Sequence, residues 1–161
     1  MAIKDNTNWN QLNREIHQKM TLEYNRKAVA YLQQLGERLV KYAREDKSAA
    51  RHYTDRTGNL RNSIGYVVVQ GGQIVKSLFN GNTTDTERNK KGDGNTIGLA
   101  YATKIAMELP TNKTYLVWVA GMEYASYVEA NGYDVITGSG DWLESRVEIE
   151  REKFKRYLLS K

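Results

Sequence analysis

The chain of 161 residues contains no cysteine and a single proline, Pro110. The lack of cysteine excludes disulfide bonds, thiolate nucleophiles and cysteine-based zinc or iron–sulfur sites. The two histidines, His17 and His52, lie far apart in the sequence, and we expect each to be a surface or helix-end residue and not a metal ligand. We therefore predict no metal site and no cofactor.

Long apolar runs and catalytic motifs are lacking as well. No run approaches the ~18 residues of a membrane-spanning helix, and the polar segment 1–13 lacks the apolar core of a signal peptide. The sequence contains no P-loop, no nucleophile elbow, no HExxH and no pair of acids at a metal-binding spacing. We expect a non-enzymatic protein with no membrane partner.

The composition is that of one domain. A chain of 161 residues with 40% hydrophobic residues can bury one core, so we predict a single domain over 1–161. Steps of three or four residues between apolar positions from Leu12 to Tyr42 indicate one amphipathic helix or two. A helix continuous to about Arg44 would be ~50 Å long, so residues 1–20 would project from the domain or form a flexible leader. A break near Thr21, a candidate N-cap, is the alternative.

The rest of the chain predicts a small sheet and further helices. Two β-branched runs, 64–69 and 74–79, flank Gly71-Gly72 and predict a β-hairpin, while 115–120 predicts a buried strand and 133–137 another extended segment. The insert 81–95 has no apolar residue and is expected to be a mobile loop. Segment 97–109 predicts a helix that Pro110 ends, and Asp141 with Glu144 resembles a cap before a C-terminal helix. The fold class is therefore α+β, with long N-terminal and C-terminal helices on a mostly antiparallel sheet.

Two short segments have residue patterns that are typical of helix caps and turns. In the first, Asp55 to Tyr66, Thr57 is a candidate N-cap, Gly58 suits a tight entry, and Leu60 and Ile64 fall four apart on one face. In the second, Ala120 to Gly132, a glycine ends the strand and a short helix follows, which Gly132 closes. Glu129 has no second acid, histidine or metal-ligand partner at a meaningful spacing, so we interpret it as a solvated or interface residue.

These segments, in the order long helix, first motif, hairpin, second motif and terminal helix, resemble the minor structural proteins of long-tailed bacteriophages. That family comprises tail-component, tail-completion and head–tail joining (neck) proteins. The positions that match its first pattern are Thr57, Gly58, Leu60, Ser63 and Ile64, and those that match its second are Tyr124, Ala125, Val128, Glu129 and Gly132. The family lends these positions no catalytic role.

The resemblance implies a phage or prophage virion protein that is present in the host bacterial cytoplasm during assembly. It would form an oligomeric ring and dock connector, portal-side adaptor or tail-tube proteins at the head–tail junction or the tail end. The insert 81–95 departs from the family pattern, which leaves the head-side or tail-side position open.

The charge of the chain is segregated. Its net charge is +5, but residues 1–63 carry 12 Lys and Arg against 7 Asp and Glu, whereas residues 117–152 carry 2 against 8. A basic and an acidic surface on one small protein suit head-to-tail association that closes a ring. Among the aromatic residues, we assign Tyr66, Trp118 and Tyr127 to the core and Trp9, in a polar leader, to a partner surface.

A basic nucleic-acid-binding module is the alternative function. Its phosphate contacts would be Arg51, Arg56, Arg61 and the helix face with Arg26 and Lys27. Arg56 and Arg61 are also candidate interface residues of the assembly protein. The insert carries equal numbers of acidic and basic residues and is a poor phosphate-binding arm, so we expect nucleic acid to bind only weakly or incidentally.

Overall fold

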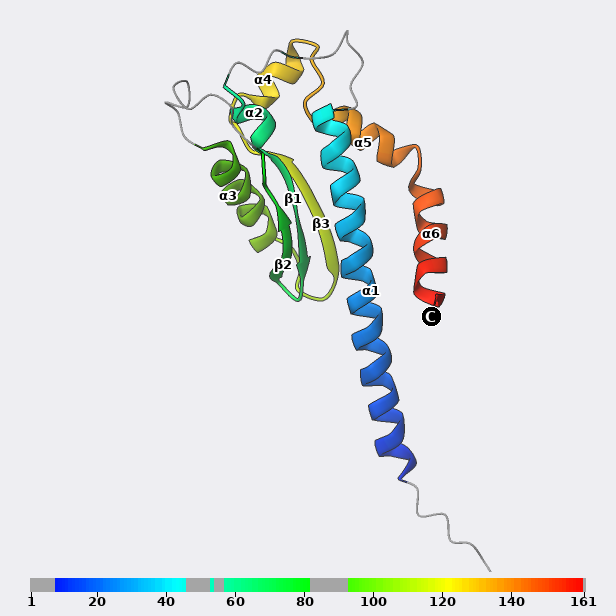
Figure 1. Cartoon of the computed structure of the whole chain (residues 1–161). Coiled ribbons are helices and arrows are strands. Elements are labelled where there is room, and N and C mark those ends of the chain that lie inside the picture. The colour runs from blue at the N-terminus through cyan, green and yellow to red at the C-terminus, as the bar shows by residue number, and fades with distance from the viewer. Residues whose placement is uncertain (1–7, 46–52, 54–56, 82–92, 161) are drawn as a thin grey trace, which may run out of the picture.

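The computed structural model describes residues 8–45, 53, 57–81 and 93–160 of the chain (Figure 1). A helix that is much longer than any other described element lies against a small sheet, and a second helix covers the opposite face of that sheet. The fold is α+β, as the sequence predicts. The elements in chain order are α1 (Trp9–Glu45), α2 (Asn59–Asn62), β1 (Ile64–Gln70), β2 (Gln73–Leu78), α3 (Gly94–Met107), β3 (Thr114–Ala120), α4 (Ala125–Ala130), α5 (Thr137–Glu144) and α6 (Val147–Leu159).

The sheet has three strands in the order β2-β1-β3, and both pairings are antiparallel. The predicted hairpin is confirmed: β1 and β2 meet at Gly71 and Gly72, whose φ angles of 59° and 78° are those that a tight two-residue turn requires. Because β1 is the central strand, it is buried on both faces. Tyr66 and Val68 belong to the core cluster on the α1 side, and Val67 and Val69 to the cluster on the α3 side.

Helix α1 is continuous over 37 residues, so the alternative of a break near Thr21 is wrong. Its C-terminal half packs on the sheet through buried residues such as Gly36, Val40 and Ala43. Its N-terminal part, residues 9–24, is exposed at every position and extends beyond the body of the molecule in Figure 1. This segment, which we call the arm, is ~24 Å long at 1.5 Å per residue.

Helix α3 begins three residues earlier than the sequence predicts, because the end of the polar insert is helical. Asp93 is its N-cap, and the Asp93 Oδ1 atom accepts from the Asn95 backbone amide at 3.1 Å. The Asn95 side chain also hydrogen-bonds to Gly81: its Oδ1 accepts from the Gly81 amide and its Nδ2 donates to the Gly81 carbonyl, both at 2.9 Å. The two ends of the insert are therefore pinned together. The expectation of a mobile loop concerns mainly residues 82–92, which lie outside the described residues.

The predicted short helix before Gly132 is present as α4, but two helices, α5 and α6, follow it where the sequence predicts an extended segment over 133–137 and one terminal helix. Residues 133–136 connect α4 to α5 without a strand. Asp141 and Glu144 lie inside α5, so their interpretation as the cap of the last helix is wrong. Helix α6 follows after a two-residue break and runs beside α1, ending well before the tip of the arm (Figure 1).

Two predictions of burial also need correction. Strand β3 is predicted to be buried, but it is an edge strand in which only Val119 is buried; Trp118 is half-buried and packs against the core. Tyr127 was predicted to belong to the core, but it is 70% exposed because the apolar face of α4 that packs inward is the one with Ala125 and Val128. Tyr66 is in the core as predicted.

Candidate assembly surfaces

The two sequence motifs meet at Ser63. This residue follows α2 directly and is fully buried at the start of β1. Its hydroxyl donates to the Leu60 carbonyl at 2.8 Å and accepts from the Met122 backbone amide at 3.3 Å, while its own carbonyl accepts from the Gly121 amide at 3.1 Å. Residues about sixty positions apart are thereby joined, and the pairing of β1 with β3 continues from this point.

Helix α3 packs on this junction at backbone distance. A Cβ atom on Gly98 would lie 2.5 Å from the Ser63 carbonyl oxygen, and one on Gly121 would lie 2.5 Å from the Gly98 Cα atom. Real Cβ atoms do not approach so closely, so the contact needs glycine on both segments. The sequence marks Gly121 as the end of a strand but gives no sign of this contact with Gly98.

Thr57 and Glu129 both accept hydrogen bonds from backbone amides at helix starts, whereas the sequence predicts Thr57 as the N-cap itself and Glu129 as a solvated or interface residue. The N-cap position of α2 is Gly58, with φ 73°, and the Thr57 hydroxyl accepts from the Asn59 amide at 3.3 Å from one position further out. The Glu129 carboxylate accepts from the backbone amides of Ile136 and Thr137 at 2.8 and 2.9 Å, so it caps the start of α5 and is not free in solvent. Burial raises the pKa of Glu129, but these hydrogen bonds outweigh it, and the net pKa lies below its ordinary value.

The motif positions therefore shape the fold. Leu60, Ser63, Ile64 and Ala125 are buried, and Val128 packs against the same core. The remaining positions are at turns or helix ends: Gly58 and Gly132 with positive φ, Thr57, Tyr124 and Glu129.

The carboxylate of Glu150 on α6 accepts hydrogen bonds from three side chains at the contact between α6 and α1. The Glu150 carboxylate is 5% exposed and accepts from both terminal nitrogens of Arg38, at 3.1 and 2.6 Å, and from Lys153 Nζ at 2.8 Å. The Tyr31 hydroxyl lies 2.8 Å from the same carboxylate. The Arg38 hydrogen bonds, with those from Lys153 and Tyr31, lower the pKa of Glu150 to about 2, and burial raises the pKa of Tyr31 to about 12. The hydrogen bonds of Glu150 with Arg38 and Tyr31 hold α6 beside α1.

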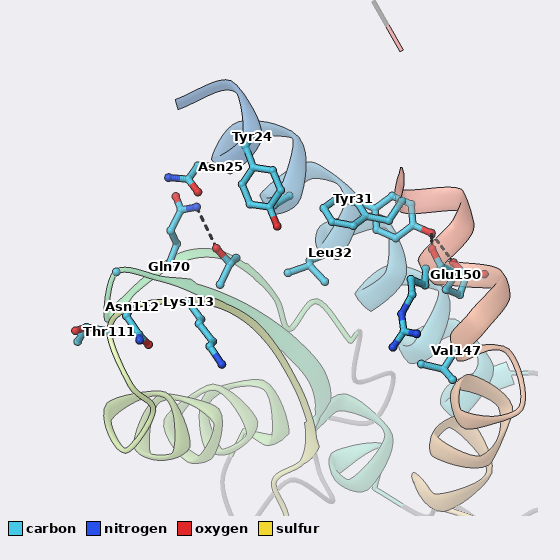
Figure 2. A pocket seen from close by; sticks show the side chains of 15 residues that line it. Tyr24, Asn25, Tyr31, Leu32, Gln70, Thr111, Asn112, Lys113, Val147 and Glu150 are labelled. Atoms are coloured by element: carbon cyan, nitrogen blue, oxygen red, sulfur yellow. Dashed lines mark hydrogen bonds between the residues drawn. The ribbon is translucent and has the colours of Figure 1, made fainter. Parts of the chain in front are cut away.

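Between α1, α6 and the ends of the strands lies a cavity of about 630 Å³, which we call the groove (Figure 2). Tyr24, Tyr31 and Leu32 line it from α1, and Val147 and Glu150 from α6 (Figure 2). Its other walls are Asn25, Ala28, Gln70, Gly71, residues 111–114, Arg151 and Phe154. The Tyr31 and Phe154 rings lie 5.0 Å apart, so the wall between the helices is aromatic.

The arm carries an apolar stripe that no described part of the chain covers. Trp9, Leu12, Ile16 and Met20 follow one another at steps of three and four residues and are 60%, 38%, 45% and 65% exposed. The exposure of Trp9 agrees with its prediction as a partner-facing residue, and the partner itself stays a prediction. We call these four residues the arm stripe.

Among the residues of the nucleic-acid alternative that the structure describes, Arg26 and Lys27 lie in the middle of α1 and Arg61 lies near its C-terminal end, so these three do not form one surface. Arg26 pairs with Glu23 at 2.7 Å, and Lys27 Nζ donates to the carbonyl oxygens of Leu158, at 3.0 Å, and Ser160. Arg61 lies 4.0 Å from Glu45. Arg51 and Arg56 lie outside the described residues.

The described part of the chain contains no cluster of three or more His, Asp or Glu residues that could hold a metal ion, and none of its helices is both long and apolar enough to cross a membrane. His17 is exposed on the arm, and His52 lies outside the described residues. Comparison with protein-family models, with curated proteins and with solved structures gave no match.

Proposed function

We propose that this protein is a non-enzymatic assembly protein of a bacteriophage or prophage virion, located at the head–tail junction or the tail end. It acts by forming a ring and docking connector, portal-side adaptor or tail-tube proteins. The observation that carries the proposal is the meeting of the two motif segments at Ser63, whose hydroxyl and carbonyl accept from the backbone amides of Met122 and Gly121 about sixty positions away.

The surfaces of the molecule support the same proposal. A projecting helical arm with exposed apolar residues suits a protein that acts through protein partners, because the free energy falls when a partner removes such residues from water. The basic candidates Arg26 and Lys27 already have partners within the chain, which favours assembly over phosphate binding.

The test is deletion of the gene from the phage or induced prophage that carries it, with electron microscopy of the lysate and wild-type protein supplied in trans as the control. Filled heads beside separate, finished tails are expected for a joining protein, and overlong or ragged tails for a tail-completion protein. Normal infectious particles would overturn the proposal. In that case the protein should be assayed for DNA binding with a steep salt dependence.

A further inference from the structure

We propose that the arm stripe of one copy of this chain docks in the groove of a second copy, in a head-to-tail contact. The inference gives a contact to the ring of the proposed function and rests on that function for its biological setting. The contact itself is argued from the arm, the groove and their charges.

The groove cannot be filled by the arm of its own chain. Tyr24 lines the groove and is also the last residue of the arm, and α1 is one continuous helix through this point. The arm therefore leads straight away from the groove, as Figure 1 shows. An arm that enters a groove must come from another molecule.

A single head-to-tail contact would cover both the arm stripe of one copy and the groove of another. The arm stripe and the groove lie at different places on the chain, so pairing of two arms would bury the stripes and leave both grooves open. Reciprocal exchange of arms between two copies would also pair stripe with groove, but it would stop at a dimer. In a heterologous contact each copy donates its arm to one neighbour and receives the arm of another, so the copies can close into a ring.

The contact between one arm stripe and one groove is small, so we expect it to be stable only when several copies assemble. The arm stripe exposes on the order of 400 Å² of side chain, so with its polar neighbours one docked arm would bury about 1,000 Å² over both copies, at the lower limit of specific interfaces. A single contact of this size is weak. A closed ring strengthens it because every copy is held twice.

Charge favours the same pairing. The Glu150 carboxylate in the groove is already neutralised by Arg38 and Lys153, whereas Lys113 is exposed at the wall of the groove and has no ion pair among the described residues. On the arm, Glu15 is exposed beside Ile16, and its partner among the described residues is the neutral Gln11 side chain. Glu15 of one copy therefore complements Lys113 of the next.

The apolar contact between the arm stripe and the groove is tested by analytical ultracentrifugation of the purified full chain over a range of concentrations. Wild-type protein is expected to form species larger than a dimer. Ile16→Lys and Val147→Lys should each weaken association about tenfold or more, since each places a charge in the contact. Their matched controls, Gln18→Lys on the opposite side of the arm and Ile149→Lys on α6 outside the groove, should leave association unchanged. Circular dichroism checks that every variant is folded.

A charge exchange then identifies the pairing. Glu15→Lys and Lys113→Glu should each weaken association, and the chain that carries both changes should regain it, because the pair is restored with reversed signs. Arm-to-arm pairing would give a dimer that is sensitive to Ile16→Lys and insensitive to Val147→Lys and Lys113→Glu, and that result would overturn the inference.

A chain that stays monomeric at every concentration would also overturn the inference, and the gene-deletion phenotype would still decide the virion role. Conversely, head-to-tail association together with normal particles after deletion would leave the contact standing and remove the proposed function.

Discussion

The guanidinium group of Arg38 on α1 holds the carboxylate of Glu150 on α6 through two hydrogen bonds of 3.1 and 2.6 Å. Because α6 runs beside α1 and forms one wall of the groove, this pair sets the position of that wall. The stability of the α1–α6 pair and the shape of the groove therefore depend on the same side chains.

We expect Glu150→Gln to lower the free energy of unfolding by about 1 to 3 kcal/mol, since it removes a charge that is 5% exposed and leaves Arg38 without its partner. The Arg38 side chain is 39% exposed, which limits the loss. Urea unfolding at pH 7 measures it. Glu148→Gln is the matched control, because Glu148 pairs with Arg151 on the exposed side of α6 and should change stability by less than about 0.5 kcal/mol. Equal effects of the two changes would contradict the prediction.

The same carboxylate makes stability depend on acid. The pKa of Glu150 is lowered from 4.5 to about 2 in the folded protein, so the unfolded chain takes up a proton at a higher pH than the folded chain does. Its stabilisation is complete above about pH 4.5 and is lost as the pH falls through about 2. Urea unfolding of wild type and Glu150→Gln at several pH values should show a difference in free energy that is constant near neutrality and shrinks below pH 4.5. A difference that persists unchanged at pH 2 would contradict this account.

Ser63→Ala should destabilise the fold, because it removes a side-chain hydrogen bond that joins the two motifs. It removes the acceptor of the buried Met122 amide and the donor to the Leu60 carbonyl, so we expect a loss of about 1 to 3 kcal/mol in unfolding free energy. Ser126→Ala is the control, because Ser126 is exposed on α4 and alanine has the higher helix propensity. The prediction fails if thermal or urea unfolding shows the same stability for both variants.

The features that could be predicted from sequence are those with a local cause. The hairpin follows from two β-branched runs and a double glycine, and the long helix from its apolar spacing. Exposure of Tyr127 could not be derived in this way, because helical spacing does not tell which face of a short helix meets the core.

Features that depend on how separate segments fold together do not follow from residue types. The Glu129 carboxylate caps α5 from seven residues away, while Asp141 and Glu144 have the residue types of a helix start but lie inside α5. The groove combines four separate stretches of chain, and Glu150 in the sequence is one acid in a run of alternating charges. No local pattern distinguishes it from its neighbours until α1 and α6 lie side by side.

The close approach of α3 to the motif junction gives the last prediction. Gly98→Ala would place a Cβ atom 2.5 Å from the Ser63 carbonyl oxygen and 2.7 Å from the Phe79 ring, and the backbone oxygen cannot move aside without disturbing the pairing of Ser63 with Gly121. We expect a loss of about 1 to 3 kcal/mol despite the better helix propensity of alanine.

Gly140→Ala is the matched control, since Gly140 is also inside a helix and its added Cβ atom would meet nothing closer than the Trp118 ring at 3.9 Å. That change should leave stability unchanged or raise it by up to about 1 kcal/mol. Thermal unfolding of the two variants side by side separates the effect of close packing from that of helix propensity. If Gly98→Ala were as stable as Gly140→Ala, α3 would have room to move away from Ser63, and the junction would not require glycine there.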